Sequence, residues 1–223
     1  MTVTGHALGF VEDGQVVGLG TGHAATAFVR ALGERIRGGL RILAVPTSEA
    51  TARLAREVGI PLVSLADHPA LDVAVDGADE VDPALDLVKG YGGALVREKI
   101  VAGAARRFVV LVEGEKLVPV LGSRGKLPVE VVPFGAAVCR ARLEALGVRP
   151  VVRLVDGAPM VTDNGNWILD CGVGPIADPP GLEHAMRAIP GLVATGLFLG
   201  MADVVLVDDG GRIETRLRAG REP

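Results

Sequence analysis

The stretch VVGLGTGHAATAFVRALGERIRGGLRILAVP, residues 16–46, decides the fold class. It predicts a strand over Val16–Leu19, a helix over Ala24–Arg37 and a second strand over Arg41–Val45. Both predicted strands are nearly all apolar, as strands are when helices cover both faces of a parallel sheet. The stretch is therefore typical of a βαβ unit in an α/β protein.

The same alternation continues through the first half of the chain. Helices are predicted over Glu49–Val58 and Leu95–Ala105, and strands over the apolar runs Pro61–Leu65, Leu71–Val75 and Phe108–Val112. This order predicts a parallel sheet with helices on both sides.

The second half of the chain begins a different pattern, after the connection LGSRGKLP at residues 121–128. The elements predicted beyond it follow the order βαββαβ, which is typical of a small ferredoxin-like α/β sandwich. They are strand Val129–Val132, helix Gly135–Leu146, strand Pro150–Val155, strand Trp167–Cys171, helix Gly181–Ala188 and strand Leu192–Leu197. Two more strands within Ala202–Leu217 are predicted to return to the first sheet. We therefore expect one domain from residues 1–125 and 198–223 and a second from residues 126–197.

The composition excludes several classes of protein. Of the 223 residues, 49% are hydrophobic and 22% are charged, which indicates a folded globular chain and not a disordered one. With a net charge of −4 and 3% aromatic residues, the chain lacks the basic and stacking surfaces that nucleic-acid binding uses. Cys139 and Cys171 are far apart and outside any CxxC motif, so we expect buried thiols and no disulfide or zinc site.

No membrane span or signal peptide is predicted. The longest uncharged runs, Gly14–Val29 and Ala188–Ala202, are shorter than the ~20 apolar residues of a span, and glycines interrupt both. The N-terminus MTVTGHALGFVEDG lacks a basic segment followed by an apolar one. We expect a cytoplasmic protein that acts on a small molecule.

The first motif, VGLGTGHAA at residues 17–25, lies where a strand ends and a helix begins. Glycines allow backbone N–H groups to approach an anion there, and the helix N-terminus adds partial positive charge. Gly20, Gly22 and Ala25 also fit a dinucleotide fingerprint, but the acidic residue expected at the tip of the second strand is missing from AVPTS, residues 44–48. Phosphate binding is favoured over NAD binding, and a structural tight turn is the remaining interpretation.

The second motif, VDGADEVD at residues 75–82, follows an apolar strand. Open α/β sheets bind ligands at the C-terminal ends of their strands, so Asp76 and Asp79 are candidate site residues. The alternatives are a solvated acidic turn and a Mg²⁺ ion held by Asp76, Asp79 and Asp82.

Two more motifs follow strands in the same half of the chain. KGYGGALVREK at residues 89–99 is a second glycine loop that enters a helix, and it contains Lys89 and Glu98. The chain has only four lysines, so a lysine directly before a glycine loop points to function. The alternatives are that Glu98 is an ordinary exposed helix residue and that Lys89 is a strand-end residue whose amine extends into solvent. EGEK at residues 113–116 brings Lys116 to the same edge of the sheet.

Together these motifs supply an anion cradle, carboxylates and a lysine. Such a set suits proton transfer next to the carbonyl of a phosphorylated substrate. A general base removes the acidic C–H proton, while a cation and hydrogen-bond donors stabilise the enediolate that develops.

At these residues the sequence resembles the type A ribose-5-phosphate isomerases. The matching strings are VGLGTG at 17–22, VDGADEVD at 75–82, KGYGGALVREKIVA at 89–102, LPVEVVPF at 127–134, VTDNGNWILD at 161–170 and IPGLVATGLF at 189–198. The resemblance implies a Rossmann-like domain carrying a smaller α/β lid and dimerisation domain, with no cofactor or metal. It also implies a homodimer or a dimer of dimers. The expected reaction interconverts D-ribose 5-phosphate and D-ribulose 5-phosphate through a cis-enediolate, in the non-oxidative pentose phosphate pathway.

The resemblance also implies roles for individual residues. Glu98 corresponds to the base that moves the proton between C1 and C2. Asp76, Asp79 and Lys89 correspond to residues that assist ring opening, bind the sugar hydroxyls and stabilise the enediolate. The remaining substrate contacts that it implies are Thr21, Gly22, His23, Ala24, Gly77, Ala78, Gly90, Tyr91, Gly92 and Lys116.

This chain departs from the family pattern at three places. The phosphate loop usually runs GTGST, whereas His23 and Ala24 follow Gly22 here. Tyr91 replaces a small residue, which predicts a narrower sugar pocket. Members often carry a lysine in the N-terminal helix, whereas Lys89 is the first lysine of this chain.

Two other functions remain as alternatives. One is the sugar-phosphate-sensing module of a transcription regulator, which would need a DNA-binding helix-turn-helix that this sequence has no segment to form. The other is a related enzyme, either another sugar-phosphate isomerase or a CoA-transferase-like protein, for which Glu98 is the one candidate nucleophile.

Overall fold

The computed structural model describes residues 2–220. Within this range the chain forms two compact units. Unit 1 comprises residues 2–78, 97–116 and 200–220, and unit 2 comprises residues 79–96 and 117–199. No helix in the described part of the chain is long and apolar enough to cross a membrane.

Unit 1 is built on a six-stranded sheet with the order β15-β14-β6-β3-β1-β2. Neighbouring strands are parallel except for β14 and β15, which are antiparallel. The strands are β1 (Val16–Leu19), β2 (Leu43–Pro46), β3 (Leu71–Gly77), β6 (Ala105–Glu113), β14 (Val204–Asp209) and β15 (Arg212–Leu217). The pairing of β14 with β6 confirms that the C-terminal strands return to the first sheet.

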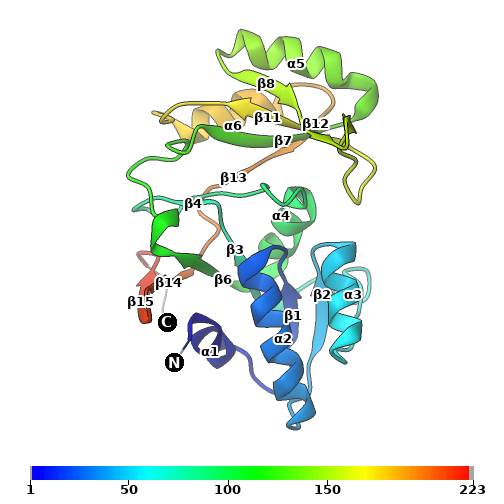
Figure 1. The fold of residues 1–223 in the computed structure, drawn as a ribbon, viewed down its shortest axis with the longest axis vertical. Coiled ribbons are helices and arrows are strands. Elements are labelled where there is room, and N and C mark those ends of the chain that lie inside the picture. Colours follow the sequence, from blue (N-terminus) through cyan, green and yellow to red (C-terminus); the bar gives the residue numbers. More distant parts are fainter. Residues whose placement is uncertain (1, 221–223) are drawn as a thin grey trace. The chain divides into compact units, whose positions relative to one another are not determined.

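Helices cover both faces of this sheet. Side chains along each strand point alternately to the two faces, and both sets are apolar here. Val17 and Leu19 of β1 pack into one apolar cluster with Phe28 of α2 (His23–Arg37). Gly18 lies on the other face, where Val101 of α4 (Leu95–Ala104) approaches it closely. The helices, drawn in Figure 1, are α1 (Val3–Ala7), η1 (Leu8–Phe10), α2 (His23–Arg37), α3 (Glu49–Glu57), α4 (Leu95–Ala104) and η2 (Gly114–Lys116).

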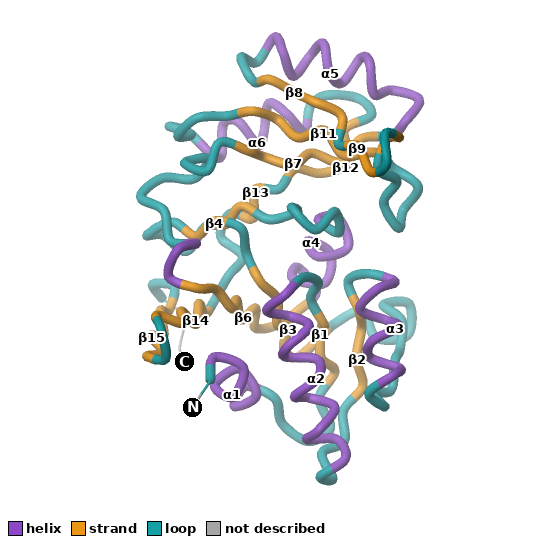
Figure 2. The backbone as a smooth tube through the Cα atoms, in the orientation of Figure 1, coloured by secondary structure: helices purple, strands orange, loops and turns teal. Residues whose placement is uncertain are grey.

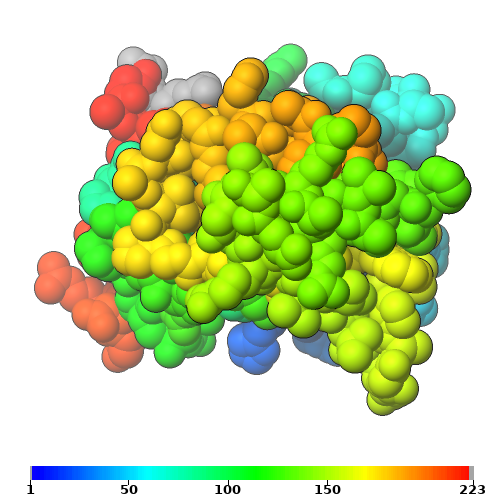
Figure 3. Space-filling model, turned by 90° about the horizontal axis from the view of Figure 1, so that it is seen from above, coloured from blue at the N-terminus to red at the C-terminus, as the bar shows by residue number. Residues whose placement is uncertain are grey.

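Unit 2 contains a four-stranded antiparallel sheet with the order β12-β7-β11-β8. Its strands are β7 (Lys126–Val131), β8 (Arg149–Val152), β11 (Trp167–Gly172) and β12 (Leu192–Thr195), and its helices are η3 (Pro133–Gly135), α5 (Ala136–Ala145) and α6 (Pro179–Arg187). Figure 2 shows these strands in orange and the helices in purple, and Figure 3 looks onto the side that carries α5, in light green. The connectivity is the βαββαβ order predicted from the sequence.

The core of this sandwich lies between the sheet and its two helices. Alternate residues of β7 face Leu143 of α5 and Met186 of α6 in one apolar cluster. Both cysteines are buried in this cluster, as expected. Burial raises the pKa of the Cys139 thiol and raises that of Cys171 to about 12, so both stay protonated at neutral pH.

Two small sheets of unit 2 were not predicted. A three-stranded sheet has the order β13-β5-β4, formed by Leu197–Phe198, Leu87–Val88 and Glu80–Val81. β9 (Leu154–Val155) and β10 (Ala158–Pro159) form a hairpin. Strands of two residues are too short to show a periodic pattern in the sequence. Residues 79–96, which contain two of these strands, were expected in the first domain but group with unit 2.

The strand predicted over Pro61–Leu65 was wrong. Only a single bridge forms there, in which Ala44 donates to the carbonyl of Pro61 and Val63 donates back to that of Ala44, each at 2.9 Å. Pro61 has no N–H to extend the ladder, and the Ser64 hydroxyl, by donating to Asp67 at 2.6 Å, turns the chain away.

Two other predicted strands are interrupted. The strand expected over Pro150–Val155 breaks between β8 and β9, at Arg153. The strand expected over Leu192–Leu197 ends at Thr195. Leu197 and Phe198 form β13, which pairs with β5 in a different sheet.

Candidate active site

The glycine loop after β1 is held directly against the end of β3. Gly20 donates its N–H to the carbonyl of Val75 at 2.9 Å, and Thr21 donates to Oδ1 of Asp76 at 3.1 Å. A Cβ on Gly20 would lie 2.2 Å from Cγ of Asp76, so only glycine permits this approach. Gly22 has a φ of 105° and caps α2 without a side chain. The loop therefore presents the N-terminus of a long helix, which favours an anion.

A cluster of hydroxyl groups lies beneath this loop. Oγ1 of Thr21 donates to Oγ of Ser48 at 2.8 Å and is 2.7 Å from Oγ1 of Thr47. Ser48 caps α3 by accepting the N–H of Thr51 at 3.0 Å, and Thr51 donates in turn to the carbonyl of Gly20 at 2.9 Å. The cluster ties the end of β2 to the glycine loop. The sequence reasoning missed it, although a serine capping the helix after β2 was a visible signal.

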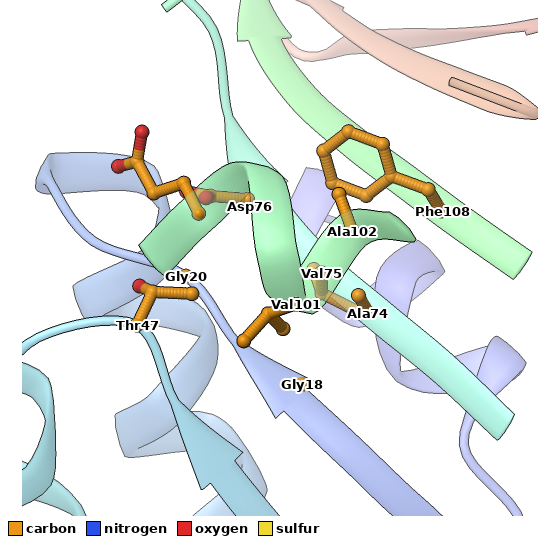
Figure 4. A pocket seen from close by; sticks show the side chains of 10 residues that line it. Gly18, Gly20, Thr47, Ala74, Val75, Asp76, Val101, Ala102 and Phe108 are labelled. Atoms are coloured by element: carbon orange, nitrogen blue, oxygen red, sulfur yellow. The ribbon is translucent and has the colours of Figure 1, made fainter. Parts of the chain in front are cut away.

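Asp76 and Glu98 line the same small recess of unit 1, which is packed too tightly to hold a water molecule. Their side chains are 3% and 4% exposed. Figure 4 shows Thr47, Gly20 and Asp76 on one side of it and Phe108 and Ala102 on the other. Besides Thr21, Asp76 accepts the N–H of Gly77 at 2.7 Å, and such bonds stabilise a buried carboxylate.

Glu98 lies on the buried face of α4. Val101 and Ala102, three and four residues further on, are also buried and line the same recess. Residues at this spacing share one side of a helix. This burial excludes the interpretation of Glu98 as an ordinary exposed helix residue. The arrangement places the side chains of Asp76 and Glu98 around one recess near the C-terminal ends of the strands.

Unit 2 holds the other predicted catalytic residues. Oδ2 of Asp79 accepts the N–H of Tyr91 at 2.9 Å, which links the turn after β3 to the second glycine loop. Lys89 is 3% exposed, donates its backbone N–H to Gly196 at 2.8 Å, and has its Nζ 5.6 Å from the ring centroid of Phe198. A buried ammonium group acts strongly on nearby charge, because little water screens it.

The side chain of Tyr91 packs within unit 2, to which the residue itself belongs. Its hydroxyl donates to the carbonyl of Lys126 at 3.2 Å, and Nζ of Lys126 lies 4.1 Å from the ring centroid. Burial, with Asp79 and Glu80 nearby, raises the pKa of Tyr91 to about 12. The ring packs against the apolar cluster of unit 2, and its narrowing of a sugar pocket stays a prediction.

The remaining predicted contacts are distributed over both units. Gly77 ends β3 and Ala78 follows it, while Lys116 ends η2 with its Nζ 3.1 Å from Oε1 of Glu115. Gly90 is buried and Gly92 is exposed in the second loop. Among residues 2–220 no group of three or more His, Cys, Asp or Glu side chains is arranged to hold a metal ion.

Comparison with known proteins gives one consistent family. The model of the ribose 5-phosphate isomerase A (phosphoriboisomerase A) family matches residues 43–211. The ribose-5-phosphate isomerase A of Roseiflexus castenholzii is 57% identical over 204 residues, which cover 90% of this chain and 87% of that protein. That of Gloeobacter violaceus is 52% identical over 214 residues, covering 96% and 93%.

Solved structures agree with the sequence relatives. The ribose 5-phosphate isomerase A of Methanocaldococcus jannaschii superposes with a TM-score of 0.92 at 43% identity, covering 96% of both chains. A D-ribose-5-phosphate isomerase in complex with phospho-erythronic acid superposes with a TM-score of 0.93 at 40% identity, covering 97% of this chain and 96% of that one. This chain belongs to the ribose 5-phosphate isomerase A family.

Proposed function

We propose that this protein interconverts D-ribose 5-phosphate and D-ribulose 5-phosphate through a cis-enediolate. The observation that carries the proposal is the burial of Glu98 and Asp76 around one recess beside the glycine loop, in a chain of this family. The solved structure of a related isomerase is in complex with phospho-erythronic acid, a phosphorylated sugar acid, which supports a sugar phosphate as the substrate class.

Glu98 is the proposed base. It takes the proton from C2 of the open-chain aldose and returns it to C1, while a second proton passes from the C2 hydroxyl to the carbonyl oxygen. The carbon skeleton and the oxidation state of the molecule as a whole are unchanged. Asp76, Asp79 and Lys89 assist ring opening, bind sugar hydroxyls and stabilise the enediolate, with Lys89 supplying positive charge to its oxygens.

The loop Thr21–Ala24 is the proposed phosphate site, with Lys116 as an additional cation. The N-terminal amides of α2 and its dipole supply the attraction. Gly77, Ala78 and the loop Gly90–Gly92 are proposed as further substrate contacts. Because Tyr91 packs its ring elsewhere, its backbone is the part expected to contribute.

Restoring the family's hydroxyls at His23 and Ala24 is expected to tighten phosphate binding. Each new hydrogen bond to a charged group contributes roughly 1.5–3 kcal/mol before water exchange is counted. The variant His23→Ser with Ala24→Thr should therefore lower the KM for ribose 5-phosphate at least about 5-fold and change kcat by less than about 2-fold, since the phosphate is bound similarly in ground and transition states. The inhibition constant of inorganic phosphate should fall with KM.

The matched control for this variant is Ala27→Thr, which adds a hydroxyl on the exposed side of the same helix. It should leave both constants unchanged. If the double variant also left KM and the phosphate inhibition constant unchanged, the loop would not be the phosphate site.

We also propose a homodimer or a dimer of dimers, formed through residues 126–197. In this region the side chain of Phe134 is fully exposed, and Val138 on the next turn is 53% exposed. Exposed apolar side chains of this kind are typical of association surfaces. Phe134→Glu is expected to lower the molar mass in solution measured by light scattering, and an unchanged mass would contradict this choice of interface.

As the family resemblance implies, the proposed place of the reaction is the non-oxidative pentose phosphate pathway in the cytoplasm. The proposed catalytic domain is 1–125 with 198–223, and the proposed lid and dimerisation domain is 126–197. Residues 79–96, 117–125 and 198–199 of the former group with unit 2 by their contacts.

The direct test is turnover by the purified protein. Incubation with ribose 5-phosphate in a buffer containing EDTA should form a ketopentose phosphate, because the proposed chemistry uses Lys89 in place of a metal ion. Binding without turnover would favour the sugar-phosphate-sensing alternative. Activity that EDTA removes and Mg²⁺ or Mn²⁺ restores would contradict the cofactor-free proposal.

A further inference from the structure

Arg153 lies in the break between β8 and β9 and forms a paired contact with Asp170 of β11. Its Nε donates to Oδ2 at 2.9 Å and its Nη2 donates to Oδ1 at 2.5 Å. The Arg153 side chain is 11% exposed and that of Asp170 is 21% exposed. A bidentate Arg–Asp pair of this kind fixes the plane of the guanidinium group. Its third nitrogen is therefore directed to a defined position.

That third nitrogen, Nη1, reaches the second glycine loop. It donates to the carbonyl of Gly90 at 3.1 Å and to the carbonyl of Tyr91 at 3.0 Å. Gly90 has a φ of 106°, a conformation that favours glycine. The loop backbone is thus held in this conformation by the partly buried guanidinium of Arg153, together with the N–H of Gly93, which donates to the carbonyl of Gly90 at 3.0 Å.

The carbonyl of Gly90 and the N–H of Tyr91 belong to the same peptide group. The N–H end donates to Oδ2 of Asp79 at 2.9 Å, while the carbonyl end accepts from Arg153. A cation at the carbonyl polarises the peptide and makes its N–H a stronger donor, because hydrogen bonds in a chain reinforce one another. Arg153 and Asp79 therefore hold opposite ends of one peptide plane.

We propose that Arg153, fixed by Asp170, is a positioning residue that orients the carboxylate of Asp79 through the Gly90–Tyr91 peptide. This inference rests on the proposed function, in which Asp79 contacts the substrate. A partly buried ion pair contributes little net stability once desolvation is counted. The hydrogen bonds from Arg153 to the carbonyls of Gly90 and Tyr91 indicate that the Arg153–Asp170 pair holds the second glycine loop in place.

The test is a double-variant cycle with Arg153→Lys and Asp79→Asn. Lysine keeps the charge but cannot contact Asp170 and both carbonyls together. In the otherwise unaltered protein, Arg153→Lys should lower kcat about 10²-fold, the loss that a small misplacement of a substrate-positioning group causes. In the Asp79→Asn background the same change should cost less than about 3-fold, since the group it positions is already impaired. Equal losses in both backgrounds would show a merely structural role and overturn the inference.

A second readout does not depend on activity. The amide proton of Tyr91 should exchange faster with solvent in Arg153→Lys and in Asp170→Asn than in the parent protein, because its hydrogen bond to Asp79 is weakened. Unchanged exchange in both variants would overturn the inference. No turnover in the parent protein would contradict the proposed function, and the exchange result would then decide the positioning role.

Arg140→Lys is the matched control. Arg140 pairs with Glu144 at 3.0 Å on the exposed surface of α5. Its replacement should change neither kcat nor the exchange of the Tyr91 amide, and melting temperatures of all variants report whether the fold is retained.

Discussion

Glu98→Gln is expected to lower kcat by about 10²–10⁴-fold, the range that a general base typically contributes. Glutamine keeps the shape of the side chain and fits the same buried position on α4, but its amide cannot accept the proton from C2. Substrate binding and folding should therefore change little. Steady-state kinetics, a binding measurement and the melting temperature separate these effects.

Glu57→Gln is the matched control for this prediction. Glu57 lies at the exposed end of α3 in the same unit, so its replacement should leave kcat unchanged. Loss of a general base costs far more than a factor of about two in rate. If the Glu98→Gln protein kept more than about half of the parent rate, another group would be the base.

Gly20→Ala is expected to lower kcat about 10²-fold, because an added methyl group displaces Asp76 or the glycine loop. The new Cβ would lie 2.2 Å from Cγ and Oδ1 of Asp76 and 2.6 Å from its Cα, and backbone atoms cannot yield as the end of a flexible side chain can. Overpacking of this kind also costs typically 1–3 kcal/mol of stability. Kinetics at a temperature where the variant is fully folded separate the loss in rate from the loss in stability.

The control is Gly9→Ala, at an exposed position where a Cβ meets no atom within 4 Å. It should change neither activity nor stability. If Gly20→Ala were as active as this control, the close packing of the loop against Asp76 would have no part in catalysis.

The parallel sheet and the ferredoxin-like sandwich could be predicted because their elements are long enough to show a period. β1 was predicted with its observed bounds, and α2 to within one residue. Asp76 and Glu98 could be selected as candidates because each lies in a short motif that follows a strand end or a glycine loop. Both signals are local in the sequence.

The rest depends on contacts between distant parts of the chain. The hydroxyl cluster joins Thr21 to residues 26 to 30 positions further on, and Arg153 meets Gly90 across 63 positions. The hydrophobic periodicity of a sequence does not indicate such pairs. Likewise Leu197–Phe198 continues an apolar run, and only its pairing with β5 shows that it leaves the sheet of β12. Similarly, nothing local in the sequence indicates that the Tyr91 hydroxyl donates to the carbonyl of Lys126.

The central claim is that Glu98 carries a proton between C2 and C1, and the fate of that proton tests it most directly. When the protein equilibrates ribose 5-phosphate with ribulose 5-phosphate in D₂O, a carboxylic acid formed on Glu98 can exchange its proton with solvent. Deuterium should therefore appear at C1 of the ketose and at C2 of the recovered aldose, as measured by NMR. The same incubation with Glu98→Gln should give neither product nor label. Deuterium incorporated by Glu98→Gln at the parent rate would show that another group carries the proton and contradict the account.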